Sequence, residues 1–131
     1  MAGVPAGGVA VLLLASHLGV LASVAAFTEG LPWLDAVLGQ LDQNGALLAS
    51  MLAEHLPRVR YAPPQASFLA WLDCRDLGLG DDPADVFQEK GNVALGHGPR
   101  FGAEGHGFAR PTRGTSPELV EEIIHRMASA L

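Results

Sequence analysis

Positive charge is scarce in this chain and absent from its beginning. The 131 residues contain 8 Lys and Arg against 14 Asp and Glu, a net charge of −6, and the first of these cations is Arg58. Nucleic-acid binding draws much of its affinity from clustered cations on one surface. Because the sequence shows no such cluster, we expect no nucleic-acid partner.

Cysteine is nearly absent, since Cys74 is the only one. A single thiol excludes an internal disulfide and a cysteine-based zinc site. It is also typical of a reducing compartment, so a cytoplasmic location is expected. Cys74 lies at the end of an apolar run, which favours a small buried residue over a catalytic thiol.

Recognised ligand-binding motifs are also missing. The glycine-rich stretch 96–107 matches neither the dinucleotide fingerprint nor a P-loop. His97 and His106 are too far apart for a helical metal pair, so we expect solvated histidines and no metal. Lys90 is the only lysine and therefore the only side chain able to form a Schiff base. It ends an amphipathic helix beside Glu89, a solvated position that does not favour catalysis.

The apolar stretch 9–27 leaves three interpretations open. A secretory signal needs a basic start, which the preceding residues do not provide. A membrane span is long enough, but no basic flank orients it and His17 would lie within the bilayer, so a membrane partner is not favoured. The third interpretation is a helix that packs against protein outside this chain.

The clearest element is a long helix over 32–56. Its apolar residues recur at spacings of three and four, Pro32 suits the first turn, and Pro57 ends it. At 1.5 Å per residue such a helix would be roughly 37 Å long, which is typical of a helix that bridges two bodies.

Shorter elements follow this helix. We expect strand segments and helices, the strand over 67–73 being covered on both faces. The helix after Asp82 has this residue as its N-cap and Pro83 in its first turn, and a capping box of Thr115 and Glu118 opens the last helix. The predicted ranges are 59–62, 67–73, 83–91, 93–95, 108–110 and 117–131. Their order predicts an α/β fold in which helices cover a small sheet.

Several ordered motifs resemble one family, the fold-type I, pyridoxal-phosphate-dependent aminotransferases, in their C-terminal domain. The branch they resemble is that of the cystathionine beta-lyases, which includes MalY and PatB. The resemblance covers 16–131, and its motifs are SHLGVLA at 16–22, EHLPRVRY at 54–61, PP at 63–64, FLAWLD at 68–73, VAL at 93–95, GP at 98–99, FG at 101–102 and GFAR at 107–110.

The resemblance implies a division of the chain and one site residue. Residues 1–15 would be an apolar segment without a family match, 16–56 helices that include the interdomain helix, and 57–131 the aminotransferase small domain. Arg110 falls on the arginine that in the family binds the α-carboxylate of the amino-acid substrate. The family uses pyridoxal 5'-phosphate and forms homodimers. No catalytic or cofactor-binding residue is expected in this chain, because in the family those groups belong to the large domain.

One stretch departs from the family pattern. Pro111, Thr112 and Arg113 follow Arg110, where the family usually continues Leu-Asn-Phe. Pro111 removes a strand N–H and restricts Arg110, and Arg113 puts charge where an aromatic residue is expected.

Two hypotheses result. The first is the C-terminal portion of a pyridoxal-phosphate-dependent C–S beta-lyase or aminotransferase that acts on amino acids. We expect such a portion to be truncated, inactive alone and prone to self-association through its apolar helices. The alternative is a stand-alone small α/β interaction module, associated with a membrane through 9–27.

Overall fold

The computed structural model describes residues 16–131, which fall into two compact units. The first unit ends at Leu38 and the second runs from Gly39 to Leu131. The expected apolar helix over 9–27 lies partly outside the described residues. The expected domain divisions after residues 15 and 56 stay predictions.

The first unit contains helix α2 (His17–Glu29) and the beginning of α3 (Leu31–His55). The Ser16 hydroxyl caps α2 by accepting a hydrogen bond from the Gly19 amide at 2.9 Å. Gly30 separates the helices, and a Cβ there would collide with the carbonyl of Ala26. No residue of α2 is buried. The exposed large apolar side chains of this unit are Leu18, Val20, Leu21, Val24, Phe27, Leu31, Trp33, Leu34 and Leu38.

Among residues 16–131, no single helix combines the length and the apolar composition needed to cross a membrane. The helices α2 and α3 meet these criteria only when taken together, across the bend at Gly30.

The second unit is built on a four-stranded antiparallel sheet of very short strands. They are β1 (Arg60–Tyr61), β2 (Leu72–Asp73), β3 (Gly96–His97) and β4 (Phe108–Arg110), in the spatial order β1-β2-β4-β3. Leu72 pairs with Ala109 between β2 and β4, and Gly96 pairs with Arg110 between β3 and β4.

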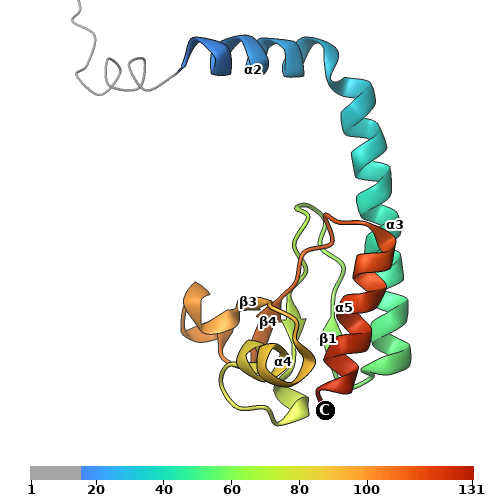
Figure 1. The fold of residues 1–131 in the computed structure, drawn as a ribbon, viewed down its shortest axis with the longest axis vertical. Helices are drawn as coiled ribbons and strands as arrows, with labels where there is room; N and C mark the ends of the chain where they lie inside the picture. The colour runs from blue at the N-terminus through green and yellow to red at the C-terminus, as the bar shows by residue number, and fades with distance from the viewer. Residues whose placement is uncertain (1–15) are drawn as a thin grey trace, which may run out of the picture. The chain divides into compact units, whose positions relative to one another are not determined.

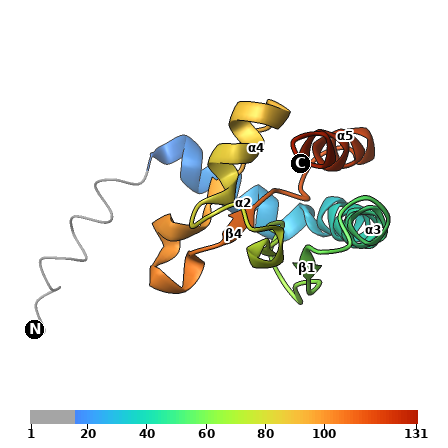
Figure 2. The same cartoon turned by 90° about the horizontal axis from the view of Figure 1, so that it is seen from below.

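Helices cover one face of this sheet, as Figures 1 and 2 show. They are α4 (Pro83–Gly91), α5 (Pro117–Ser129) and the C-terminal half of α3. The helix α4 packs on α5 and on β4. The helix α5 lies beside α3, where the rings of His55 and His125 meet edge to face at 5.0 Å. The predicted α/β fold, a small sheet covered by helices, is confirmed.

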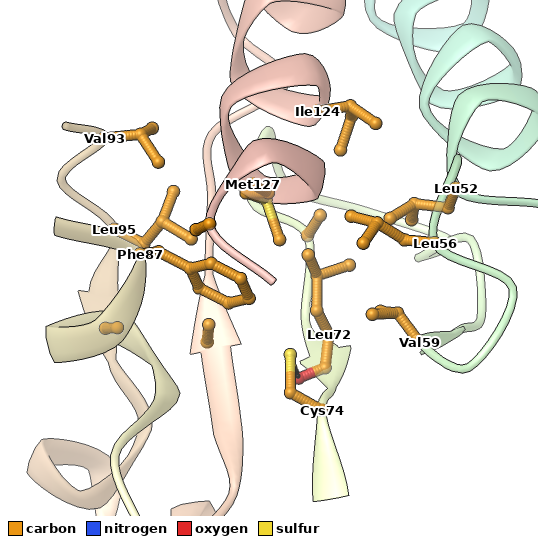
Figure 3. Close-up of a cluster of buried hydrophobic side chains, with 14 of the residues drawn as sticks. Leu52, Leu56, Val59, Leu72, Cys74, Phe87, Val93, Leu95, Ile124 and Met127 are labelled. Carbon is orange, nitrogen blue, oxygen red and sulfur yellow. Dashed lines mark hydrogen bonds between the residues drawn. The ribbon is translucent and has the colours of Figure 1, made fainter. Parts of the chain in front are cut away.

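The core lies between these helices and the sheet (Figure 3). Leu48, Leu52 and Leu56 recur every four residues, so α3 and the residue that follows it present one apolar stripe. From the other side, Phe87 of α4 and Ile124 and Met127 of α5 are fully buried. The remaining buried apolar residues are Val59, Ala70, Leu72, Cys74, Leu77, Ala84, Val93, Leu95, Ala109, Val120 and Ala130.

Three expectations about strands need correction. The strand predicted over 67–73 is regular only at Leu72–Asp73, although a bridge between Leu69 and Thr112 continues the same pairing. Residues 93–95 are not a strand, since β3 begins one residue later, at Gly96. The strand over 67–73 is not covered on both faces, because Trp71 is 38% exposed. Short alternating patterns therefore located the sheet without defining its edges.

Two helix caps also differ from expectation. Asp82 occupies the N-cap position of α4, but its side chain does not cap the helix and instead pairs with His97. The cap of α5 is Ser116, whose hydroxyl accepts from the Leu119 amide, so the predicted Thr115 cap is one residue too early.

Candidate functional site

Arg110 is the last residue of β4 and lies on the sheet face opposite the helices. Side chains of a strand alternate between its two faces. Ala109 is fully buried against the helices, so its neighbours Phe108 and Arg110 point to the other face. The β3 partner of Arg110 is Gly96, which has no side chain on that face.

A glycine and an aromatic ring surround the Arg110 side chain. Its guanidinium carbon lies 3.9 Å from the centroid of the Phe101 ring, a cation–π contact. A Cβ at Gly96 would come within 3.2 Å of Arg110 Nε, closer than side chains normally approach. The arginine is thus held between the β3 backbone and the Phe101 ring, which fixes its orientation.

Arg110 has no acidic partner among residues 16–131. No salt bridge or side-chain hydrogen bond to its guanidinium is present there, and its Nε atom is buried without an acceptor. Other arginines of the described residues, such as Arg75 and Arg126, do pair with a carboxylate. A guanidinium that is oriented but not neutralised can donate two parallel hydrogen bonds to a carboxylate, in a bidentate pair.

The Phe101 ring belongs to a row of aromatic side chains on the same face. Trp71 meets Phe101 edge to face at 5.8 Å and stacks on Phe108 at 5.4 Å. Arg75 lies over Phe108, 5.0 Å from its centroid. We call Phe101, Trp71 and Phe108 the aromatic row. Since Phe101 is 50% exposed, the row leaves an apolar surface next to the arginine.

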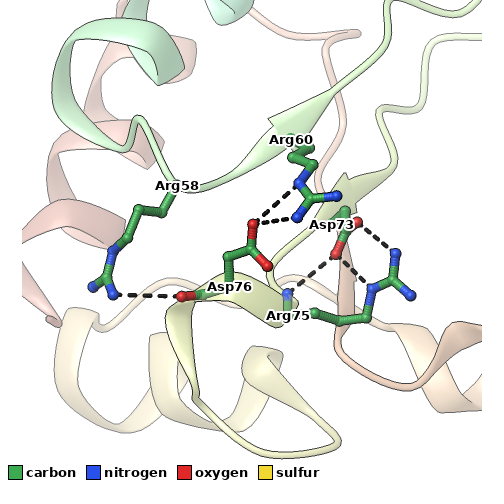
Figure 4. A network of polar contacts seen from close by, with 5 residues as sticks. All are labelled: Arg58, Arg60, Asp73, Arg75 and Asp76. Atoms are coloured by element: carbon green, nitrogen blue, oxygen red, sulfur yellow. Dashed lines mark hydrogen bonds and ion pairs between the residues drawn. The ribbon is translucent and has the colours of Figure 1, made fainter.

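The arginines nearer β1 differ from Arg110 because each of their guanidinium groups donates a hydrogen bond to an oxygen of Asp73 or Asp76 (Figure 4). Arg75 donates to both carboxylate oxygens of Asp73, at 2.9 and 2.7 Å. This hydrogen bonding lowers the pKa of Asp73 below its ordinary value. Arg60 pairs with the Asp76 carboxylate, which raises the pKa of Arg60, and Arg58 reaches the Asp76 carbonyl at 3.4 Å.

The stretch after Arg110 is accommodated in the sheet rather than disrupted. The Pro111 carbonyl accepts from the Ala70 amide at 3.0 Å, so pairing continues past the proline. Arg113 is only 5% exposed, and its guanidinium lies inside the second unit. The departures from the family pattern at Pro111 and Arg113 therefore do not end the pairing between this stretch and residues 69–70.

The two loop histidines have different surroundings. His106 is exposed, as predicted, and lies 3.5 Å from an Asp81 oxygen. His97 is not solvated, because its Nδ1 lies 2.9 Å from an Asp82 oxygen and its side chain is 17% exposed. Asp85 brings a third ligand atom within 4.8 Å of the other two. The sequence did not predict this His97 cluster, in which Asp82 lies 15 positions away along the chain.

Cys74 and Lys90 have the placements that the sequence indicates. Cys74 is buried, and burial raises the pKa of its thiol to about 12, so it is not a nucleophile at neutral pH. Lys90 is exposed at the end of α4.

Phe101 and Gly96 are the site residues that sequence reasoning did not assign. Phe101 belongs to the FG motif at 101–102, but only the folded structure shows that its ring contacts Arg110. The available signal was the alternation along β4, which already places Phe108 and Arg110 on one face.

Comparison with known proteins assigns the class. No protein-family model matches the chain. A Mycobacterium leprae protein, provisionally named a cystathionine beta-lyase, is 42% identical over 129 residues, which cover 88% of this chain and 32% of that protein. Cystathionine beta-lyase PatB of Bacillus subtilis is 36% identical over 86% of this chain and 29% of its own length.

A solved structure shows the same fold. The pyridoxal-phosphate-bound C–S lyase of Staphylococcus hominis has a TM-score of 0.82 and 26% identity, over 88% of this chain and 31% of that one. These likenesses confirm the resemblance to the C-terminal domain of fold-type I, pyridoxal-phosphate-dependent aminotransferases. Within that class the chain belongs to the cystathionine beta-lyase branch of MalY and PatB. It spans about a third of the length of these curated relatives.

Proposed function

We propose that this chain provides the substrate-carboxylate site of a pyridoxal-phosphate-dependent C–S beta-lyase that acts on amino acids. The observation that carries the proposal is Arg110, held on Phe101 with no acidic partner among residues 16–131. A bidentate pair with the α-carboxylate would satisfy this guanidinium and orient the amino acid. The family membership of the chain supports the same role for Arg110.

The described residues do not themselves fit the cofactor. Pyridoxal phosphate needs a lysine for its Schiff base, and the only lysine, Lys90, is exposed on α4 with Glu89 beside it. The cofactor, when bound, supplies an electron sink for bond cleavage at the amino acid. In this proposal that chemistry takes place on polypeptide outside residues 16–131, and the part played by this chain is carboxylate binding.

The apolar helices of the first unit form a surface that we assign to contact with other polypeptide of the same enzyme. Phe27 is 88% exposed and Trp33 is 71% exposed, on helices that bury none of their large apolar side chains up to Leu38. Such a contiguous apolar surface marks a site of protein contact. The relatives are about three times as long as the matched stretch. We propose that polypeptide equivalent to their remaining two thirds covers these helices, in a homodimer.

The first experiment is the intact mass of the gene product, captured from its source cells with an antibody against α5. A mass about three times 13.7 kDa would support the proposal that cofactor-binding polypeptide is attached. If the product has a mass of 13.7 kDa, we expect no beta-lyase activity from it with added pyridoxal phosphate. Thiol release by that short product would contradict the assignment of the chemistry to other polypeptide.

The role of Arg110 is tested by Arg110→Lys in the cofactor-loaded product. Lysine keeps the charge but loses the fork geometry, so KM for the amino acid should rise about tenfold or more. The matched control is Arg126→Lys, since Arg126 is an exposed arginine on α5 that pairs with Glu122. An unchanged KM in Arg110→Lys would refute the carboxylate site.

A further inference from the structure

Residues 111–115, which we call the exit segment, leave β4 directly after Arg110 and are held by a buried arginine. Arg113 is 5% exposed. Its Nη1 donates to the Leu41 carbonyl of α3 at 3.0 Å, and its Nη2 donates to the Ser67 carbonyl at 2.8 Å. One guanidinium thus ties the exit segment to two other parts of the chain, at Leu41 and at Ser67, that are far from it in sequence.

The backbone of the exit segment is held as well. The Arg113 amide donates to the Phe68 carbonyl at 2.8 Å. Asn44 of α3, 1% exposed, donates through Nδ2 to the carbonyls of Arg113 and Thr115, at 2.9 and 2.7 Å. Gln40 in turn donates to the Asn44 oxygen at 3.0 Å, which fixes the Asn44 amide.

A glycine on α3 makes room for this arrangement. A Cβ at Gly45 would lie 2.6 Å from Arg113 Nη1. That distance is shorter than any real Cβ contact, so an alanine would displace the guanidinium from the Leu41 carbonyl. The pairing of Gly45 with Arg113 explains how a charged side chain fits where the family pattern has an aromatic one.

The charge of Arg113 has no counter-ion among residues 16–131. Both of its side-chain hydrogen bonds go to main-chain carbonyls, and its Nε is buried without an acceptor. Burial raises the pKa of nearby Tyr61, and the charge of Arg113 opposes that rise. Burying an unpaired cation is costly. Lysine lacks the planar fork whose two Nη groups reach these two carbonyls from one rigid group.

We propose that Arg113 is a positioning residue for Arg110, and that Gly45 is the residue that admits it. The role assigned to Arg110 rests on the function proposed above. Two residues separate the arginines, and one of them, Pro111, has a fixed φ that makes the connection stiff. By holding the exit segment on α3 and on 67–70, Arg113 keeps the end of β4 in register, with Arg110 over Phe101.

The test uses nuclear magnetic resonance on the unaltered chain and on Arg113→Lys and Gly45→Ala. In the unaltered chain, the Arg113 guanidinium protons should exchange at least about tenfold more slowly than those of exposed Arg126, because two carbonyls hold them. In both variants, the Ala70 amide should exchange about tenfold faster, while the Val93 amide, bonded to Phe87, should not change. The Arg110 side-chain protons should lose the ring-current shift caused by Phe101.

This ring-current shift separates positioning from a general loss of stability. A variant that is only less stable would keep the shift in its folded state and would show faster exchange everywhere. That result, or fast exchange of the Arg113 guanidinium in the unaltered chain, overturns the proposal. The exchange rate of the Arg113 guanidinium is measured on the unaltered chain, so fast exchange there would overturn the proposal even if neither variant folds. All of these nuclear magnetic resonance readouts are taken without substrate or cofactor. An unchanged KM in Arg110→Lys would therefore refute the carboxylate site but would leave the positioning of Arg110 by Arg113 standing.

Discussion

At the scale of single residues, an arginine of this chain is defined by what its guanidinium faces. Arg75 and Arg60 lie on carboxylates, Arg113 lies on carbonyls, and Arg110 lies on an aromatic ring. The sequence singled out Arg110 through the family resemblance. It did not predict the burial of Arg113, because the space for that side chain comes from Gly45, 68 positions earlier.

Cys74 should be unreactive as long as the second unit is folded. Its pKa of about 12 leaves a far smaller thiolate fraction at pH 8 than in an unfolded chain, and burial also blocks access. We expect iodoacetamide to modify the native thiol at least about a thousandfold more slowly than the denatured one. Mass spectrometry of timed samples with and without denaturant measures this ratio. Rapid alkylation of the native chain would show that the core around Cys74 opens readily.

Asp73 should make the second unit sensitive to acid. Arg75 lowers the pKa of Asp73 in the folded state, so this pair adds stability above the unfolded-state pKa, about 3.9. That stability is lost as the pH falls through the folded-state pKa. Asp73→Asn should therefore flatten the dependence of the unfolding free energy on pH below about pH 4. Urea unfolding at several pH values tests this, with the exposed Glu121→Gln as control. Equal slopes in Asp73→Asn and the unaltered chain would contradict it.

At the scale of elements, helices were easier to predict than strands. The structure places α3 at Leu31–His55, one residue from the predicted bounds at each end, because a long apolar period and two prolines define it. Strands of two or three residues carry too little alternation to define their ends. Their edges here depend on tertiary contacts, such as the Ala70 amide bond to Pro111 and the 3.9 Å contact of Arg110 with Phe101.

The contact between α4 and α5 should depend on a glycine. A Cβ at Gly91 would lie 2.6 Å from the Arg126 carbonyl oxygen and 3.3 Å from the Ala130 Cβ. Relieving this clash would require the α5 backbone to move away from α4, so Gly91→Ala should destabilise the second unit by about 1–3 kcal/mol. Gly39→Ala on α3 is the matched control, because nothing lies within 4 Å of a Cβ there. That change should be neutral or stabilising by up to about 1 kcal/mol. Denaturant unfolding of both variants gives the comparison, and equal effects would contradict this packing.

At the scale of the whole molecule, burial is divided unequally between the two units. Every buried apolar residue of the described core lies between Leu48 and Ala130. No residue of 17–38 is buried, and the large apolar side chains there other than Val37 are exposed. A unit that buries its own core can fold alone, whereas an exposed apolar helix pair needs a partner to cover it. The two units should therefore differ in both stability and association.

A shortened chain that begins at Gly39 should fold and remain monomeric, whereas the 131-residue chain should self-associate. The shorter piece keeps α3 from Gly39 onward, the sheet, α4 and α5, and therefore the entire core. It loses Phe27 and Trp33, whose exposed rings favour association in water. Sedimentation velocity over a concentration series measures association, and circular dichroism with thermal unfolding measures folding.

The double variant Phe27→Glu and Trp33→Glu in the full chain separates loss of this surface from shortening. It should lower association without changing the unfolding of the second unit. Association of the shorter piece at the same concentrations would place the contact surface on the second unit, with the exposed aromatic row beside Arg110 as the next surface to alter.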